Sequence, residues 1–176
     1  LILKSIGELK DKEFVPLLRD VLKKENRAQI IHEAVNSLIL IDSLPAYKVV
    51  VDFFEKHKKE DYAEKVEKSL KLFFSKNHLV FHFDVFYRNR GNLAGIDKSC
   101  DFLIEHLPED FIQELIPTLN TRYHTIRFQL LRLLKTRPHA RYYSAVYNFF
   151  ASFYEKADTD LFLLMCETLA LCAARS

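Results

Sequence analysis

Apolar residues recur along most of the chain at spacings of three and four, which is typical of amphipathic α-helices. The first clear stripe, at spacing i, i+3, i+4, i+7 and i+8, consists of Phe14, Leu17, Leu18, Val21 and Leu22. A break at residues 25–26 precedes a second stripe over residues 30–38, and residues 60–76 continue the pattern. Ser43 and Pro45 predict a helix start, because Ser caps helices and Pro suits their first turn. We therefore expect an all-α fold.

The pattern also repeats over a longer distance. In every second predicted helix, one apolar or small residue is followed by an inward pair near i+3 and i+4, and these six positions are Ile2, Ala34, Val66, Cys100, Leu130 and Cys166. Their separations are 32, 32, 34, 30 and 36 residues. Such a step predicts helical hairpins stacked in a row, because one hairpin alone cannot bury its apolar face.

The step divides the chain into about five and a half hairpins of a single repeat array over residues 1–176. The expected repeats are 1–25, 26–58, 59–90, 91–120, 121–157 and an incomplete 158–176. Residues 88–95 hold two of the three glycines and predict a longer loop. The pattern is already under way at Leu1, and the last apolar helix has no partner. Because an array needs polar caps at its ends, we expect either a fragment of a longer protein or ends that something else covers.

At this point the sequence resembles the HEAT and HEAT-like (armadillo-type) repeat family. Residues 2–11, Ile-Leu-Lys-Ser-Ile-Gly-Glu-Leu-Lys-Asp, are similar to the family's first-helix ending and its turn Asp, and Pro16 matches the Pro of the second helix. Arg127 lies three residues before the fifth repeat position, where the family often has Arg, and Asp158 and Asp160 lie roughly where it places turn aspartates. The resemblance implies a right-handed α–α superhelix, or solenoid, in which these three residues stabilise turns.

Composition excludes several classes of protein. The 176 residues are 49% hydrophobic with only three Gly and five Pro, so neither disorder nor a Gly-rich phosphate loop is expected. The chain has no apolar stretch near the roughly 20 residues that span a bilayer, and no leader is visible. The three cysteines, an odd number without a C-x-x-C pair, are expected to be reduced. We therefore expect a cytoplasmic protein without membrane insertion and without a cofactor.

The candidate reactive residues each have a simpler interpretation. His78 and His82 could share a helix face as metal ligands with Asp84 nearby, but no further ligand is evident. Cys100 occupies a repeat position, so it is expected to be buried and inert rather than a nucleophile. Acidic pairs such as Glu109 and Asp110 suit the first turn of a helix. We expect no metal site and no enzymatic activity.

One segment is unusual in its charge. Between Glu114 and Glu155 there is no carboxylate side chain, and many aromatic residues are interleaved with six cations: Arg122, Arg127, Arg132, Lys135, Arg137 and Arg141. At about 100° per residue the first three spiral around their helix instead of forming a stripe, and Arg127 is expected to tie a turn by hydrogen bonds. The remaining cluster near one turn is the candidate partner-binding site: Arg132, Lys135, Arg137, Arg141 and Tyr142. It could be a face in contact with solvent or with a neighbouring part of the same chain, or it could bind an acidic protein or nucleic acid.

The expected function is that of a non-catalytic scaffold or adaptor for protein–protein interaction, which uses the concave surface that the family resemblance implies. Two alternatives stay open. HEAT-like repeats also occur in alkylpurine DNA glycosylases, so the basic and aromatic segment 115–154 could bind nucleic acid. The array could also be a regulatory domain that acts on a larger enzyme or transporter of the same chain.

Overall fold

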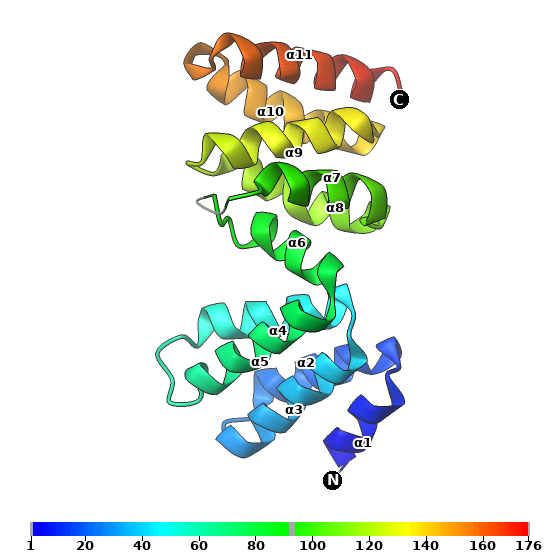
Figure 1. The fold of residues 1–176 in the computed structure, drawn as a ribbon, viewed down its shortest axis with the longest axis vertical. Coiled ribbons are helices and arrows are strands. Elements are labelled where there is room, and N and C mark those ends of the chain that lie inside the picture. Colours follow the sequence, from blue (N-terminus) through cyan, green and yellow to red (C-terminus); the bar gives the residue numbers. More distant parts are fainter. Residues whose placement is uncertain (1, 92–93, 176) are drawn as a thin grey trace. The chain divides into compact units, whose positions relative to one another are not determined.

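The computed structural model describes residues 2–91 and 94–175. Over these residues the chain forms eleven α-helices and four short 3-10 helices, and no strand (Figure 1). The all-α prediction is therefore confirmed. The chain divides into two compact units, which we call unit 1 (Leu1–Phe81) and unit 2 (His82–Ser176).

Unit 1 is built around helix α3, which packs against α1, α2, α4 and α5, while α2 also packs against α4. The helices of this unit are α1 (Ile2–Leu9), α2 (Val15–Lys24), α3 (Ala28–Ile41), α4 (Leu44–Lys56) and α5 (Ala63–Lys76), with a 3-10 turn η1 (Lys12–Phe14) before α2. Helix α6 (His78–Tyr87) begins in unit 1 and continues into unit 2. Every second helix of the unit is thus a spatial neighbour, in the sequence α1, α3, α5.

Unit 2 follows the same scheme around helix α9, which packs against α7, α11 and the 3-10 segment η2 (Figure 1). Its helices are α7 (Ile96–His106), α8 (Glu109–Leu115), α9 (His124–Thr136), α10 (Tyr143–Phe153) and α11 (Thr159–Ala173). Three 3-10 segments complete it, namely η2 (Ile116–Asn120), η3 (Ala140–Tyr142) and η4 (Tyr154–Lys156). Helix α10 packs against α11 and η2, so alternate helices are again neighbours.

Local capping signals set several helix boundaries where the sequence predicts them. The Ser43 hydroxyl accepts a hydrogen bond from the backbone N–H of Ala46 at 3.3 Å, and Pro45 lies in the first turn of α4. Asp158 caps α11 in the same way, accepting from the N–H of Leu161 at 2.8 Å. These side chains satisfy backbone donors that have no partner inside the helix.

Two of the expected element boundaries lie at turns, and the structure places them as follows. The helix expected over residues 60–76 begins only at Ala63, because residues 57–62 form the turn after α4. The expected loop over residues 88–95 is confirmed for its described residues, and residues 92 and 93 lie outside them. Gly95 adopts φ of 83°, a left-handed conformation that glycine takes without the steric cost of a Cβ atom.

Four of the six repeat positions lie in the core, since Ala34, Val66, Cys100 and Leu130 are at most 1% exposed. The other two expectations are wrong. Ile2 is 78% exposed at the start of α1, and Cys166 is partly exposed. Helix α11 buries a different stripe, so its inward face is displaced from the extrapolated repeat; that stripe is Leu161, Leu164, Met165, Thr168 and Cys172.

Small side chains join alternate helices. The Ser37 hydroxyl of α3 donates to the carbonyl oxygen of Leu3 in α1 at 2.6 Å. The Thr168 hydroxyl of α11 donates to the carbonyl of Leu164 in its own helix at 2.7 Å and lies 3.4 Å from the carbonyl of Leu131 in α9. Gly7 brings α1 still closer to α3, because a Cβ atom built on it would lie 2.7 Å from the Cα atom of Ser37. Close helix contact in unit 1 therefore depends on the absence of a side chain at position 7.

A search of the described helices for a span of bilayer length and apolarity found none.

A candidate interaction site on helices α9 and α10

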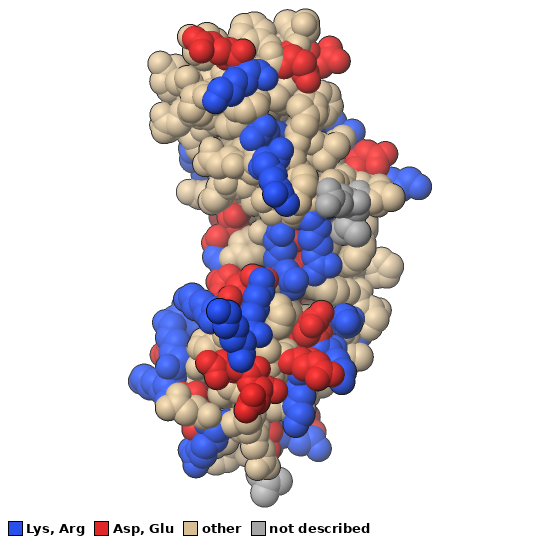
Figure 2. All heavy atoms as spheres, turned by 90° about the vertical axis from the view of Figure 1, so that its left-hand side faces the viewer, with Lys and Arg blue, Asp and Glu red and all other residues tan. Residues whose placement is uncertain are grey.

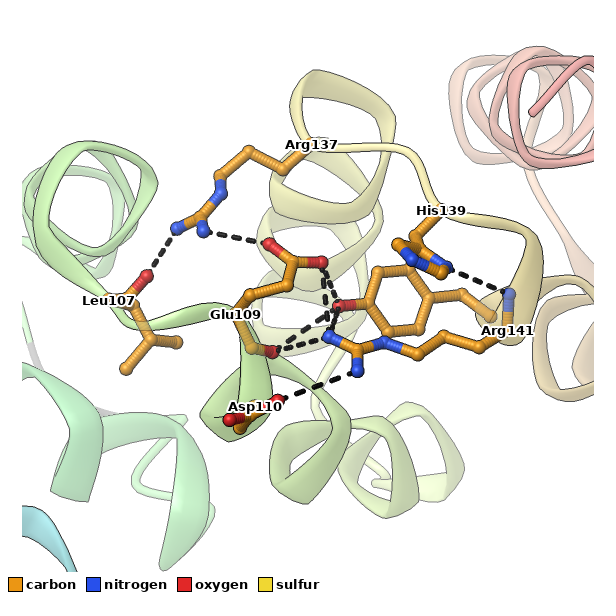
Figure 3. A network of polar contacts seen from close by, with 7 residues as sticks. Leu107, Glu109, Asp110, Arg137, His139 and Arg141 are labelled. Atoms are coloured by element: carbon orange, nitrogen blue, oxygen red, sulfur yellow. Dashed lines mark hydrogen bonds and ion pairs between the residues drawn. The ribbon is translucent and has the colours of Figure 1, made fainter.

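The turn between α9 and α10 is held by two carboxylates from α8, chiefly Glu109, with Asp110 Oδ1 at 3.6 Å from Arg141 Nη1. Figure 3 shows Arg137 and Arg141 converging on Glu109, the first residue of α8. Arg137 Nη2 lies 2.8 Å from Glu109 Oε2, and Arg141 Nη2 lies 3.3 Å from Oε1. The Tyr142 hydroxyl donates to Oε1 as well, and Arg137 Nη1 donates to the carbonyl oxygen of Leu107. The two guanidinium groups are thus bound within unit 2.

Burial and hydrogen bonding shift the pKa values of this cluster. Burial raises the pKa of Glu109, but the hydrogen bond from Tyr142 and the positive charge of Arg137 outweigh it, and the net pKa is lowered. Burial, with the hydrogen bond to Glu109, raises the pKa of Tyr142 to about 12. At neutral pH, Glu109 is therefore an anion and Tyr142 a neutral donor, which is the combination that the contacts require.

The other two predicted cations are also paired within the unit. Arg132 Nη2 contacts a carboxylate oxygen of Asp101 in α7, and Lys135 Nζ lies 2.6 Å from Glu167 Oε2 in α11. All four cations of the predicted cluster thus face carboxylates that lie outside the acid-free segment of the sequence. Tyr142 is fully buried, so its ring is not part of a surface. The arrangement matches the interpretation in which the cations meet a neighbouring part of the same chain.

The three predicted turn residues have different environments. The Arg127 guanidinium lies over the ring of Phe153, 4.2 Å from its centroid, and burial lowers its pKa. Its Nε atom has no hydrogen-bond partner, so the expected hydrogen bonding is replaced by a cation–π contact because α10 places an aromatic ring there. Asp158, which caps α11, also pairs with His124 Nε2 at 2.9 Å. Asp160 is exposed in the first turn of α11.

Of the residues considered for metal binding or catalysis, His78 is the first residue of α6 and belongs to unit 1, whereas His82, Asp84 and Cys100 have contacts in unit 2. His82 Nδ1 lies 3.0 Å from the Ser99 hydroxyl, and buried Asp84 pairs with Arg90 Nε at 2.8 Å. Among the described residues no three His, Cys, Asp or Glu side chains are grouped as metal ligands. The Cys100 thiol donates to the carbonyl oxygen of Gln129, and burial raises its pKa to about 11. A thiol of that pKa is protonated at neutral pH and is a poor nucleophile.

Sequence reasoning missed an exposed aromatic face on α10. Phe149 is buried, but Tyr143 and Tyr147 are 40% and 50% exposed and stack on each other with centroids 6.1 Å apart. Tyr154, 46% exposed, stacks on Phe150 in the same way. Helical geometry could have predicted this exposure. At 100° per residue, Tyr143 and Tyr147 point about 110° away from the buried pair Val146 and Phe149.

A groove runs along the other side of α10. It has a volume of about 360 Å³ and lies between η2 and α10, where it is lined by Ile116, Pro117, Leu119, Asn120, Ala145, Asn148 and Phe149. No carboxylate lines the groove. We call the opposite side of α10, which carries the exposed Tyr143 and Tyr147, the α10 face. The α10 face therefore offers aromatic groups rather than reactive ones.

No family model matches the chain, and no curated protein or solved structure matches it either.

Proposed function

We propose that the protein is a HEAT-like helical repeat protein whose function is to bind a protein partner, without making or breaking bonds. The packing of alternate helices within each unit supports the repeat, because α1, α3 and α5 are neighbours, as are α7, α9 and α11. Polar contacts between these helices join residues about one repeat apart: the Ser37 hydroxyl donates to the Leu3 carbonyl, and the Thr168 hydroxyl lies 3.4 Å from the Leu131 carbonyl. Repeat arrays of this kind present extended binding surfaces.

The observation that carries the proposal is the exposed α10 face. Tyrosine is enriched at protein interfaces because it contributes a large amphipathic area with little side-chain freedom to lose. Tyr143 and Tyr147 have this character.

The test is to identify a partner by cross-linking and affinity capture, and then to measure its Kd with purified proteins. The double substitution Tyr143→Ala/Tyr147→Ala should weaken binding at least about tenfold, as expected when aromatic anchors are removed. Leu17→Ala is the matched control, because Leu17 is 49% exposed but lies in unit 1. Unchanged affinity of the double variant would refute the role of the α10 face. Catalytic turnover that is lost on a single polar substitution would refute the non-catalytic function.

The ion pairs count against the nucleic-acid alternative. Arg132, Lys135, Arg137 and Arg141 each face a carboxylate of the same unit. Phosphate binding gains from the release of counterions around free cations, and cations that are already paired gain less. We therefore propose protein binding rather than nucleic-acid binding.

A further inference from the structure

Unit 1 contains a pocket of about 300 Å³ between α2 and α4, which we call the α2–α4 pocket. Its apolar part is formed by Leu22 of α2 with Val49 and Phe53 of α4. Three cations line it as well, and these are Arg19, Lys23 and Lys56. Figure 2 shows lysine and arginine side chains, with carboxylates among them, on the surface of this unit. The pocket therefore combines a small apolar floor with a positive rim.

The cations of the pocket are not satisfied as those of unit 2 are. Arg19 Nε and Lys23 Nζ lie 3.9 and 4.0 Å from Asp20 Oδ1, which is too far for a hydrogen bond. Lys56 has neither an ion pair nor a hydrogen bond from its ammonium group within the described part of the chain. By contrast, Arg137 and Lys135 of unit 2 have carboxylate oxygens at 2.8 and 2.6 Å. The N–H donors in the pocket thus remain free for a ligand.

The aromatic wall of the pocket is held rigidly. His57 stacks on Phe53 with ring centroids 4.3 Å apart, and Tyr62 stacks on Phe53 at 5.9 Å. His57 Nδ1 lies 2.8 Å from the carbonyl oxygen of Phe53, which can only accept, so Nδ1 carries the hydrogen. This bond fixes the orientation of the imidazole ring and leaves Nε2 for another contact. A ligand therefore meets a preformed surface.

We propose that the α2–α4 pocket binds a phosphomonoester attached to a small apolar or aromatic group. The phosphate contacts Arg19, Lys23 and Lys56, and the attached group packs on the apolar floor. Arginine suits this role because its planar guanidinium pairs with two phosphate oxygens at once. The volume lies at the lower end of the range for ligand pockets, which favours one small ring over a nucleotide. The site belongs to unit 1 and does not depend on the α10 face.

Three features oppose an anion in the pocket. The C-terminal ends of α2 and α4 carry partial negative charge, which acts only over the last turn. Asp52 lies among the lining residues, and Asp20 forms long ion pairs with Arg19 and Lys23. Three cations against these two carboxylates leave a net charge of +1, so the site still favours an anion.

The test is a calorimetric titration with phenyl phosphate at low salt, together with NMR of the backbone amides. We expect saturable binding, with shifts confined to residues 19–23 and 49–57, and weaker binding of inorganic phosphate because it lacks the apolar group. Arg19→Gln/Lys56→Gln should weaken phenyl phosphate binding about tenfold or more. Lys59→Gln, an exposed lysine outside the pocket, should stay within about twofold because its charge is screened by solvent.

The second variant is chosen because it should bind phenyl phosphate more tightly, which misfolding cannot produce. Asp52→Asn should strengthen phenyl phosphate binding about threefold, because it removes the carboxylate of the pocket. The proposal is overturned by three results: no saturation at low salt, equal losses in Arg19→Gln/Lys56→Gln and Lys59→Gln, or equal affinity for inorganic phosphate. Binding of a short phosphotyrosine peptide then shows whether the phosphate belongs to a modified protein side chain or to a small molecule. Tighter binding of the peptide assigns the site to a modified side chain of a partner, and equal binding assigns it to a small molecule.

Discussion

At the scale of single residues, Glu109 and Tyr142 show how burial and charge combine to hold a turn. The carboxylate meets two guanidinium groups and one phenol, and all of them come from a turn about 30 residues away in the sequence. A carboxylate is stable in this position because charge-assisted hydrogen bonds replace its contacts with water. The phenol must stay protonated in order to donate, so the turn depends on the protonation state of Tyr142.

This dependence predicts a pH-sensitive contribution to stability. The folded pKa of Tyr142 is about 12, against an ordinary value of 10.0. Because the folded pKa is raised, the neutral phenol stabilises the native state fully below pH 10.0, and this stabilisation is lost as the pH rises towards about 12. Tyr142→Phe should cost about 1 kcal/mol at neutral pH through the lost hydrogen bond. The variant should also lack the loss of stability at alkaline pH. The free energies of unfolding of the two proteins should therefore converge or cross near the folded pKa of Tyr142.

Urea denaturation of both proteins from neutral to alkaline pH measures the difference. Tyr143→Phe is the control, since Tyr143 is the next residue and is 40% exposed, whereas Tyr142 is fully buried. It should follow the wild type throughout. A constant difference between Tyr142→Phe and the wild type at every pH would show that the ionisation of Tyr142 does not affect folding.

At the scale of helices, the sequence predicts most of the elements and part of their burial. Ser43 and Asp158 act as caps because capping depends on residues within one turn. The inward faces of α3, α5, α7 and α9 agree with the repeat, whereas those of α1 and α11 do not. A helix face is set by its actual neighbours, and extrapolation from a repeat of 30 to 36 residues cannot fix it to one residue.

The partners of the predicted cations could not be predicted from the segment that contains them. Asp101, Glu109 and Glu167 lie on neighbouring helices about 30 residues away, so the absence of carboxylates from segment 115–154 was misleading. The exposure of Tyr143 was missed for a related reason, because an aromatic residue at helical spacing is equally compatible with a core and with a surface. Both errors concern contacts that only the packing of helices determines.

The contact between α1 and α3 leads to a prediction about Gly7. Alanine is favoured over glycine in an isolated helix by about 1 kcal/mol, but here the new Cβ would lie 2.7 Å from Ser37 Cα and 3.1 Å from Leu40 Cδ1. Overpacking against a backbone atom costs about 1 to 3 kcal/mol, so Gly7→Ala should destabilise unit 1 or detach α1.

Urea denaturation and hydrogen exchange of the α1 amides test this. Glu8→Ala serves as the control, because Glu8 has an exposed side chain whose ion pair with Lys4 is 3.7 Å long and contributes little. If Gly7→Ala instead stabilised the protein, the close approach of α1 and α3 would be wrong.

At the scale of the whole molecule, net charge and local charge lead to different expectations. The chain has a formal net charge of +2, and the acid-free segment alone suggests a strongly basic surface. Four of its six cations, however, are neutralised by carboxylates from adjacent helices. We therefore expect no binding to duplex or single-stranded DNA at moderate salt, as measured by fluorescence anisotropy.

The salt dependence of DNA binding gives a quantitative test of this prediction. If all six cations contacted phosphates, the slope of log K against log salt concentration would be about −5. We expect at most weak binding at low salt with a much shallower slope. A slope near −5 would mean that DNA displaces the internal carboxylates, and it would favour the nucleic-acid alternative over protein binding.

The hydrogen bond that Ser37 donates to the adjacent helix ends on the main-chain carbonyl group of Leu3. Every amino acid has such a carbonyl, so the bond constrains where the adjacent backbone lies but not which side chain stands there. Deep mutational scanning should accordingly find that fewer amino acids are tolerated at the donor, Ser37, than at the acceptor, Leu3, as far as this bond is concerned. Sequence drift at the acceptor can then continue while the spacing between helices is preserved.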